Sequence, residues 1–395
     1  MTSTETMDPL QQVPQGVESA FPAAEYDARQ AAVRDRMRAR GIDLAVLTGP
    51  ENIFYLTGQQ TPGYYTFQAL CIPAEGAPFL VLRGLEAMNA KLNTFLADLV
   101  GYADDEPPAA ALAGALRDRG WLGRRIAVDR NAWFLTVNLH AQLVAELGDL
   151  GDATGLVEPL RRVKSPAELE QIAAAGRAND AGMRAGLAAV AAGATENDVA
   201  DAIMGAAIAS GSEYVGMEPF VTSGPRSGVP HTTWRRRRLQ PGDVAVLETS
   251  ACFNRYHAAL FRTVAIGTVP DEVHEMYAVC MEGLDAALAR LRPGNTCADV
   301  HAAAQEVIDR HGQTAGYRKR TGYSMGISFA PDWGEGNILS LFRGIDVPLE
   351  PGMVFHVPIT LRAWNRFTVA VSETVQVTDG APRTFSDIPR DLVRL

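Results

Sequence analysis

The stretch LQPGDVAVLETSACFNRYHAALFRTV (239–264) decides the fold expected for this chain of 395 residues. Its turn pair Pro241-Gly242 precedes a run rich in aliphatic residues, which predicts strand structure over 243–267. A similar turn precedes MVFHVPITLRA (353–363), and FTVAVSETVQVTDG (367–380) also has strand composition. We therefore expect the C-terminal half to contain a strand-rich core.

Helices are predicted between these strands. The segment RRVKSPAELEQIAAAGRANDAGMRAGLAAVAAG (161–193) has Ser165 as N-cap, Pro166 at the first helical position and Glu168 three residues after the cap. Three more segments have helical composition: TENDVADAIMGAAIASG, DEVHEMYAVCMEGLDAALARL and CADVHAAAQEVIDRHG. Because the segment at 161–193 also marks a change in organisation, we predict two domains, 20–160 and 161–395.

The N-terminal domain is expected to be α/β, because helical and strand patterns alternate along it. The predicted elements are a helix at 26–40 that ends at Gly41, a strand at 42–49, a strand pair at 69–83, a helix over LEAMNAKLNTFLADLV (85–100) and a strand at 124–130.

Composition excludes several classes of function. The net charge of −10 makes nucleic-acid binding a poor expectation, since an acidic surface repels phosphates. No apolar run approaches the roughly 20 residues that span a bilayer, and the polar N-terminus does not resemble a signal peptide. The four cysteines are scattered, without a Cys-x-x-Cys pair. We expect reduced thiols, a cytoplasmic location and a small-molecule partner in place of nucleic acid or membrane.

The order of these segments resembles the creatinase/prolidase/methionine-aminopeptidase superfamily. The resemblance covers about 230 residues in order. It implies a creatinase-like N-terminal α/β domain, a C-terminal pita-bread α+β catalytic domain and a homodimer. It is carried by Lys164-Ser165-Pro166 with Glu168, SGPRSGVPH (223–231), the stretch at 239–264, RTGYSMGIS (320–328), LEPGMVF (349–355) and SETVQVT (372–378).

Within that superfamily, four strings are similar to those of ectoine hydrolases, which open the cyclic amidine of ectoine and belong to a branch that works without the two metal ions. The strings are PHTTW (230–234), FNRYH (253–257), GYSMGISFAPDWGE (322–335) and LEPGMVFH (349–356). The Pro- and Gly-rich APDWGEG (330–336) is expected to form a rigid wall or lid of the site.

Metal-dependent members hold two divalent ions with two Asp, one His and two Glu. The resemblance aligns these positions with Glu248, Ala259, Tyr323, Pro358 and Glu373. Glu373 keeps the ligand, and Glu248 replaces an Asp by a longer acid. Ala259, Tyr323 and Pro358 are side chains that cannot serve as ligands here. Two carboxylates alone would not hold a dinuclear pair, so we predict no metal and no other cofactor.

Three residues are predicted to be catalytic. His231 matches the acid–base histidine of the superfamily, and its type suits proton transfer near neutral pH. Glu248 lies among aliphatic residues, which predicts a raised pKa and a role as base or nucleophile. Glu373 alternates with valines at 369, 371 and 375, and we expect it to be buried and to hold a cationic substrate nitrogen.

These residues predict hydrolysis of a C–N bond at an amidine- or guanidine-like carbon, which is cationic and needs no Lewis acid. The predicted substrate-binding residues are Tyr65, Tyr256, His257, Arg262, Tyr323, Trp333 and His356. A substrate carboxylate would need a cation, for which the run Arg235–Arg238, Arg320 and Arg262 are candidates. A metal-dependent Xaa-Pro dipeptidase or aminopeptidase, a lyase and a non-catalytic binder remain the alternatives.

Overall fold

The computed structural model describes residues 13–317 and 319–395. The chain divides into two compact units, Met1–Arg161 and Arg162–Leu395. The sequence places the boundary after residue 160. Within the described ranges, no helix is both long and apolar enough to cross a membrane.

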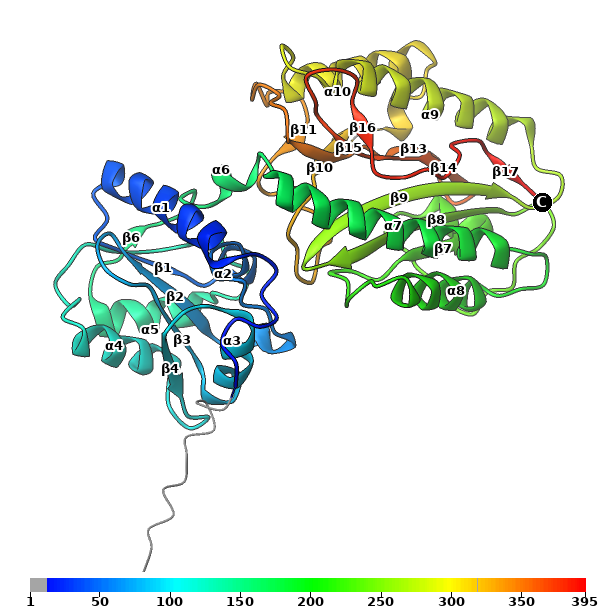
Figure 1. Ribbon diagram of the computed structural model, residues 1–395. Helices are drawn as coiled ribbons and strands as arrows, with labels where there is room; N and C mark the ends of the chain where they lie inside the picture. The colour runs from blue at the N-terminus through cyan, green and yellow to red at the C-terminus, as the bar shows by residue number, and fades with distance from the viewer. Residues whose placement is uncertain (1–12, 318) are drawn as a thin grey trace, which may run out of the picture. The chain divides into compact units, whose positions relative to one another are not determined.

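The first unit is a six-stranded mixed sheet in the order β4-β3-β2-β1-β5-β6, with helices on its faces (Figure 1). Its interior is a cluster of aliphatic and aromatic side chains between the sheet and α4 and α5. The elements are α1 (Ala23–Arg40), β1 (Leu44–Leu47), α2 (Pro50–Thr57), β2 (Gln68–Pro73), β3 (Phe79–Arg83), α3 (Ala87–Asn93), β4 (Asp98–Tyr102), α4 (Pro108–Asp118), β5 (Ile126–Val128), α5 (Val137–Leu147), β6 (Gly151–Asp152) and α6 (Glu158–Arg161).

One prediction for this unit is wrong. The segment 85–100 was expected to be a single helix, but helix α3 ends at Asn93 and β4 begins at Asp98. Thr94 has extended backbone angles, and β4 then pairs in parallel with β3. Pairing with a neighbouring strand outweighs the local helical preference of this segment.

The helices of the second unit form two pairs. As predicted, α7 (Pro166–Ala189) begins with a capping box in which Ser165 and Glu168 exchange side-chain and backbone hydrogen bonds. It packs beside α8 (Glu196–Ala209), and α9 (Asp271–Arg290) packs beside α10 (Cys297–Arg310). The same capping motif begins α8 and α10, at Thr195 and Thr296.

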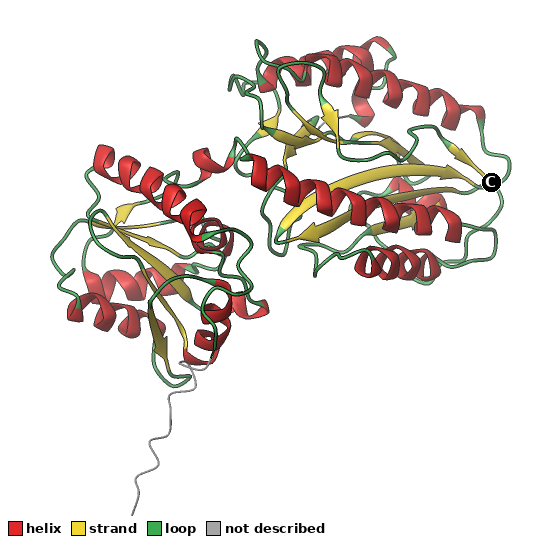
Figure 2. Ribbon diagram, viewed as in Figure 1, coloured by secondary structure: helices red, strands yellow, loops and turns green. Residues whose placement is uncertain are grey.

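The strands of this unit lie between the two helix pairs (Figures 1 and 2). One sheet has the order β17-β9-β8-β7 and packs on α7. The β13–β14 hairpin packs on α9, and the remaining strands form a sheet in the order β11-β10-β12-β15-β16. The bounds are β7 (Phe220–Ser223), β8 (Val244–Phe253), β9 (Tyr256–Ala265), β10 (Gly322–Ser324), β11 (Ser340–Leu341), β12 (Val354–His356), β13 (Ile359–Ala363), β14 (Phe367–Val371), β15 (Thr374–Gln376), β16 (Arg383–Thr384) and β17 (Val393–Arg394).

The deciding stretch 239–264 forms the long β8–β9 hairpin. Its two-residue turn, Asn254-Arg255, has positive φ at both positions (47° and 61°), as a tight hairpin turn requires. The segment 367–380 differs from the continuous alternating strand that we expected. It is divided at Ser372-Glu373 into β14 and β15, which pair with β13 and β12 in different sheets.

Candidate active site

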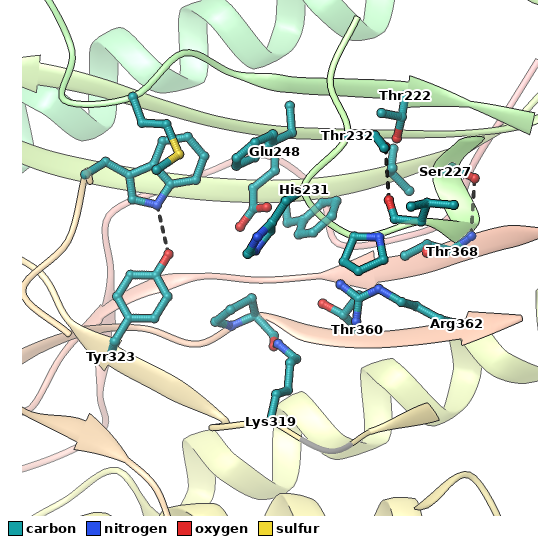
Figure 3. A pocket seen from close by; sticks show the side chains of 18 of the residues that line it. Thr222, Ser227, His231, Thr232, Glu248, Lys319, Tyr323, Thr360, Arg362 and Thr368 are labelled. Carbon is teal, nitrogen blue, oxygen red and sulfur yellow. Dashed lines mark hydrogen bonds between the residues drawn. The ribbon is translucent and has the colours of Figure 1, made fainter. Parts of the chain in front are cut away.

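A cavity of about 630 Å³ lies in the second unit, between the β7–β8–β9 sheet and the β13–β14 hairpin. Its wall is completed by the loop after β7, by residues 319–323 and by the 331–333 segment. The volume suits a small molecule. Of the ten predicted site residues, His231, Glu248, Tyr323 and Trp333 line this cavity (Figure 3).

Glu248 lies on β8 between two phenylalanines. Phe220 of β7 and Phe261 of β9 are its cross-strand partners, so both rings share the face of the sheet that bears the carboxylate. Burial raises the pKa of Glu248 to about 7, although Lys319 and Arg362 act in the opposite direction. The Glu248 carboxylate opens into the cavity. It makes no hydrogen bond to any residue that the structure describes.

His231 lies on the loop after β7 and faces the same part of the cavity (Figure 3). Its φ of 55° places the backbone in the left-handed region, which a residue other than glycine seldom adopts. The imidazole stacks on Phe220, with ring centroids 6.1 Å apart and planes inclined by 16°. A strained backbone that presents a side chain to a cavity is typical of functional sites.

Tyr323 and Trp333 form another part of the cavity wall and belong to a chain of hydrogen bonds. The Trp333 indole N–H donates to the Tyr323 hydroxyl (2.8 Å), which lies 2.8 Å from Nδ1 of His356. Burial lowers the pKa of His356 to about 3, so its imidazole is neutral. The tyrosine therefore donates to Nδ1, and Nε2–H donates to the Ser372 hydroxyl at 2.6 Å. His356, which does not line the cavity itself, thus holds the Tyr323 hydroxyl in position.

The 331–333 segment is held from behind by a buried ion pair. Lys164 Nζ lies 2.9 Å from Glu335 Oε2, and both side chains are 1% exposed. Trp333 itself is 3% exposed and meets Phe220 edge to face at 5.4 Å between ring centroids. This segment therefore forms a wall of the cavity, consistent with its Pro- and Gly-rich sequence.

Two cations that sequence reasoning did not select also line the cavity. Lys319 Nζ donates to the carbonyl of Pro358 at 2.6 Å, and burial lowers its pKa to about 7. Arg362 lies on β13, directly opposite Thr368 of β14. Burial lowers the pKa of Arg362 as well. Recognising Arg362, and also Phe220 and Phe261, requires the strand register, which the sequence motifs do not give.

Glu373 does not line the cavity, and the substrate-binding role predicted for it does not fit its surroundings. Its Oε1 accepts hydrogen bonds from Arg262 (2.8 Å) and Arg390 (3.1 Å). Arg262 is fully buried and also donates to the carbonyl groups of Ser372, Ile388 and Pro389. The Arg262 guanidinium and Oε1 of Glu373 are thus paired within the protein, whereas Oε2 of Glu373 is buried without a hydrogen-bond partner among the described residues.

Tyr256 and His257, predicted as binding residues, have contacts away from the cavity. The Tyr256 hydroxyl donates to Glu168 (2.8 Å) at the start of α7. His257 Nε2 accepts from the Gly216 amide (3.0 Å), and Nδ1 donates to the Arg255 carbonyl (3.0 Å). Burial lowers the pKa of His257 to about 3, so this imidazole is neutral. Tyr65 belongs to the first unit, where it is 71% exposed.

The arginine run 235–238 does not line the cavity. Arg237 pairs with Asp243, and Arg238 donates to the carbonyl of Gly193. Arg320 does line it, with its guanidinium 4.6 Å from the centre of the Tyr323 ring and a hydrogen bond to Ser340.

The residues present do not fit a pair of divalent ions. At the five positions aligned with metal ligands, Glu248 and Glu373 alone carry carboxylates, and Glu373 is held by two guanidinium groups. Tyr323 and Pro358 line the cavity, and Ala259 offers a methyl group. Across 13–317 and 319–395, no group of three or more His, Cys, Asp or Glu side chains could hold a metal ion.

Comparison with known protein families assigns both units of the chain. Residues 170–379 match the Metallopeptidase family M24, and residues 29–163 match the Creatinase/Prolidase N-terminal domain. The chain therefore belongs to the M24 family, and the predicted superfamily and fold class are confirmed.

The relatives of this chain include an ectoine hydrolase and an Xaa-Pro dipeptidase. It is 31% identical to the ectoine hydrolase of Halomonas elongata over 94% of this chain and 98% of that protein. It is 26% identical to the Xaa-Pro dipeptidase of Lactobacillus helveticus over 89% of this chain and 94% of that protein. Among solved structures, the prolidase from Thermococcus sibiricus superposes with a TM-score of 0.84 at 23% identity, covering 94% and 99% of the two chains.

Proposed function

We propose that this protein hydrolyses a C–N bond, other than a peptide bond, in a small cationic amidine or guanidine resembling ectoine or creatine, and that it does so without a metal ion. The observation that carries the proposal is the Glu248 carboxylate, which opens into a small cavity beside His231 and has no counter-ion within salt-bridge distance among the described residues. The similarity to an ectoine hydrolase supports the same choice of substrate class.

The amidinium carbon suits this arrangement because it is already electrophilic. In the proposed reaction, water attacks that carbon while Glu248 accepts a proton, or Glu248 itself attacks first and water then releases the product. His231 donates a proton to the departing nitrogen. The sum is one water added across the C–N bond, which converts an amidinium ion into an amide and a protonated amine. A pKa near 7 leaves Glu248 able to accept the proton at neutral pH.

The rings of Phe220 and Trp333 would border the planar cation in this reaction. Their faces carry negative partial charge, which favours a cation when water is excluded. The Phe220 ring contacts both His231 and Trp333, so it lies between these two side chains.

Metal analysis combined with a substrate screen tests the proposal. The purified enzyme, stripped of metal with a chelator, should hydrolyse a cyclic amidine or guanidine from a panel containing ectoine and creatine. The variant E248Q should be inactive and folded, whereas E350Q, which changes an exposed glutamate, should be fully active. Strong Xaa-Pro cleavage that appears only after addition of Mn²⁺, Co²⁺ or Zn²⁺ would refute metal independence and favour a dipeptidase.

We also propose a homodimer in the cytoplasm. The four cysteines are free and buried, which is compatible with a reducing compartment. Light scattering on the eluting protein measures the mass directly, and a monomer at micromolar concentration would contradict the dimer.

A further inference from the structure

We infer that Lys319 and Arg362 form an anion-binding subsite that recognises one carboxylate on the substrate, so that the enzyme selects zwitterions. This inference rests on the proposed function for the identity of the cationic end of the substrate. The subsite itself is argued from the charges in the cavity. Of the arginines suggested by the sequence, Arg262 and the run 235–238 are absent from the cavity wall, whereas Arg320 lines it and packs against the Tyr323 ring.

The guanidinium of Arg362 has no direct hydrogen-bond or salt-bridge partner among the described residues, although it is partly buried. A guanidinium removed from water without a partner is destabilising, so a partner of opposite charge is expected when the site is occupied. The planar group offers parallel N–H donors that match the two oxygens of a carboxylate.

The neighbours of Arg362 suit an anion. Thr368 is its cross-strand partner, and Thr360 lies two residues before it on β13, so all three side chains share the face that borders the cavity. The Thr368 hydroxyl is buried without a hydrogen-bond partner. Lys319 approaches the same region and uses one of its three N–H groups on the Pro358 carbonyl.

The arrangement of charges in the cavity also indicates how a substrate with one positive and one negative end would be oriented. In Figure 3, Glu248 and His231 lie on one side of the cavity, whereas Lys319, Thr360 and Arg362 lie on the other. Neither cation lies within 4.0 Å of the Glu248 carboxylate among the described salt bridges, so no direct ion pair joins the two sets, although both cations act to lower the pKa of Glu248. A ligand with a cationic end near Glu248 and a single negative charge near Arg362 complements both sets. A dianion would be repelled by Glu248.

Calorimetry on the full chain tests the subsite without requiring turnover. Ectoine, creatine and proline are each compared with the corresponding carboxamide, which lacks the negative charge. Wild type should bind at least one acid about tenfold or more tightly than its amide, and R362M should remove that preference while amide binding is unchanged. K319M should reduce it, and R362K should retain part of it. R343M, which changes an exposed arginine, serves as the control.

Thermal unfolding separates this role from a structural one. Because Arg362 has no partner in the folded protein, R362M should melt at the wild-type temperature or above it. If no acid binds more tightly than its amide, or if R362M weakens acids and amides equally and lowers the melting temperature, the subsite is refuted. If the acid preference and its loss are observed but no panel member is hydrolysed, the proposed function fails and the subsite stands.

Discussion

Replacing Glu248 by Gln should make the protein more stable in alkaline solution, because the wild-type carboxylate is costly to ionise between two phenylalanine rings. Burial raises the pKa of this group from 4.5 to about 7. At about 1.4 kcal/mol for each pH unit between these values, ionisation in the folded state costs about 3 kcal/mol more than in the unfolded chain. Glutamine resembles the protonated acid and stays neutral.

The direction of this pH dependence follows from the difference in proton binding between the folded and the unfolded state. Between about pH 4.5 and about pH 7, the folded protein keeps a proton that the unfolded chain has lost, so wild-type stability from this group falls as pH rises through the window. The gain in E248Q should be absent near pH 4.5 and reach about 3 kcal/mol above pH 7 or so. For a domain of this size, that corresponds to a rise in melting temperature of roughly 6–12 °C.

Urea and thermal denaturation near pH 4.5 and near pH 8.5 measure the difference. E350Q, at an exposed position, should give equal stability to wild type at both values. An E248Q variant that is less stable than wild type near pH 8.5, or that gains equally at both pH values, would show that the carboxylate is not held in a desolvated setting.

Three further predictions concern the surroundings of the cavity. R262M should lower the free energy of unfolding by about 3–5 kcal/mol in urea, and R262M combined with E373M should recover part of this loss, since the double variant has no buried carboxylate without Arg262 and Arg390 keeps Asp285 as a partner. Stability should fall as pH drops from about 6.5 towards 3, because His257 and His356 have pKa values of about 3 in the folded state and take up protons on unfolding; urea titrations across this range measure the slope. Y323F should cost about 1–3 kcal/mol, because it leaves two buried nitrogen groups without their shared hydroxyl, and it should change the tryptophan fluorescence; unaltered stability and emission would contradict the hydrogen-bond chain.

Local signals in the sequence predicted the elements with strong boundaries. Ser165 was predicted as the N-cap of its helix and is confirmed, since such a cap depends on a few neighbouring residues. The helices after Thr195 and Thr296, which were predicted from composition, begin with the same motif in the structure. The helix expected over 85–100 failed because β4 is formed by pairing with β3, a contact between segments that local propensity does not contain.

The same distinction separates the site residues. His231, Glu248, Tyr323 and Trp333 stand at motif positions, and the structure brings them to one cavity. Arg362 stands in no motif. Its relevance depends on the register of β13 against β14, which places it on the cavity face beside Thr368. A run of charge such as 235–238 therefore does not indicate which arginines border the cavity.

Glu373 shows why a retained motif residue need not retain its role. In metal-dependent members of the superfamily, a carboxylate at this position is balanced by divalent ions; here the balance comes from Arg262 and Arg390. Burial raises the pKa of Glu373, and the two guanidinium groups act against this. A buried carboxylate needs positive charge near it whether or not it binds a ligand. The motif position therefore predicts burial and a cationic partner. Of these two carboxylates, Glu248 alone lines the cavity, and the proposed reaction assigns the catalytic role to it for that reason.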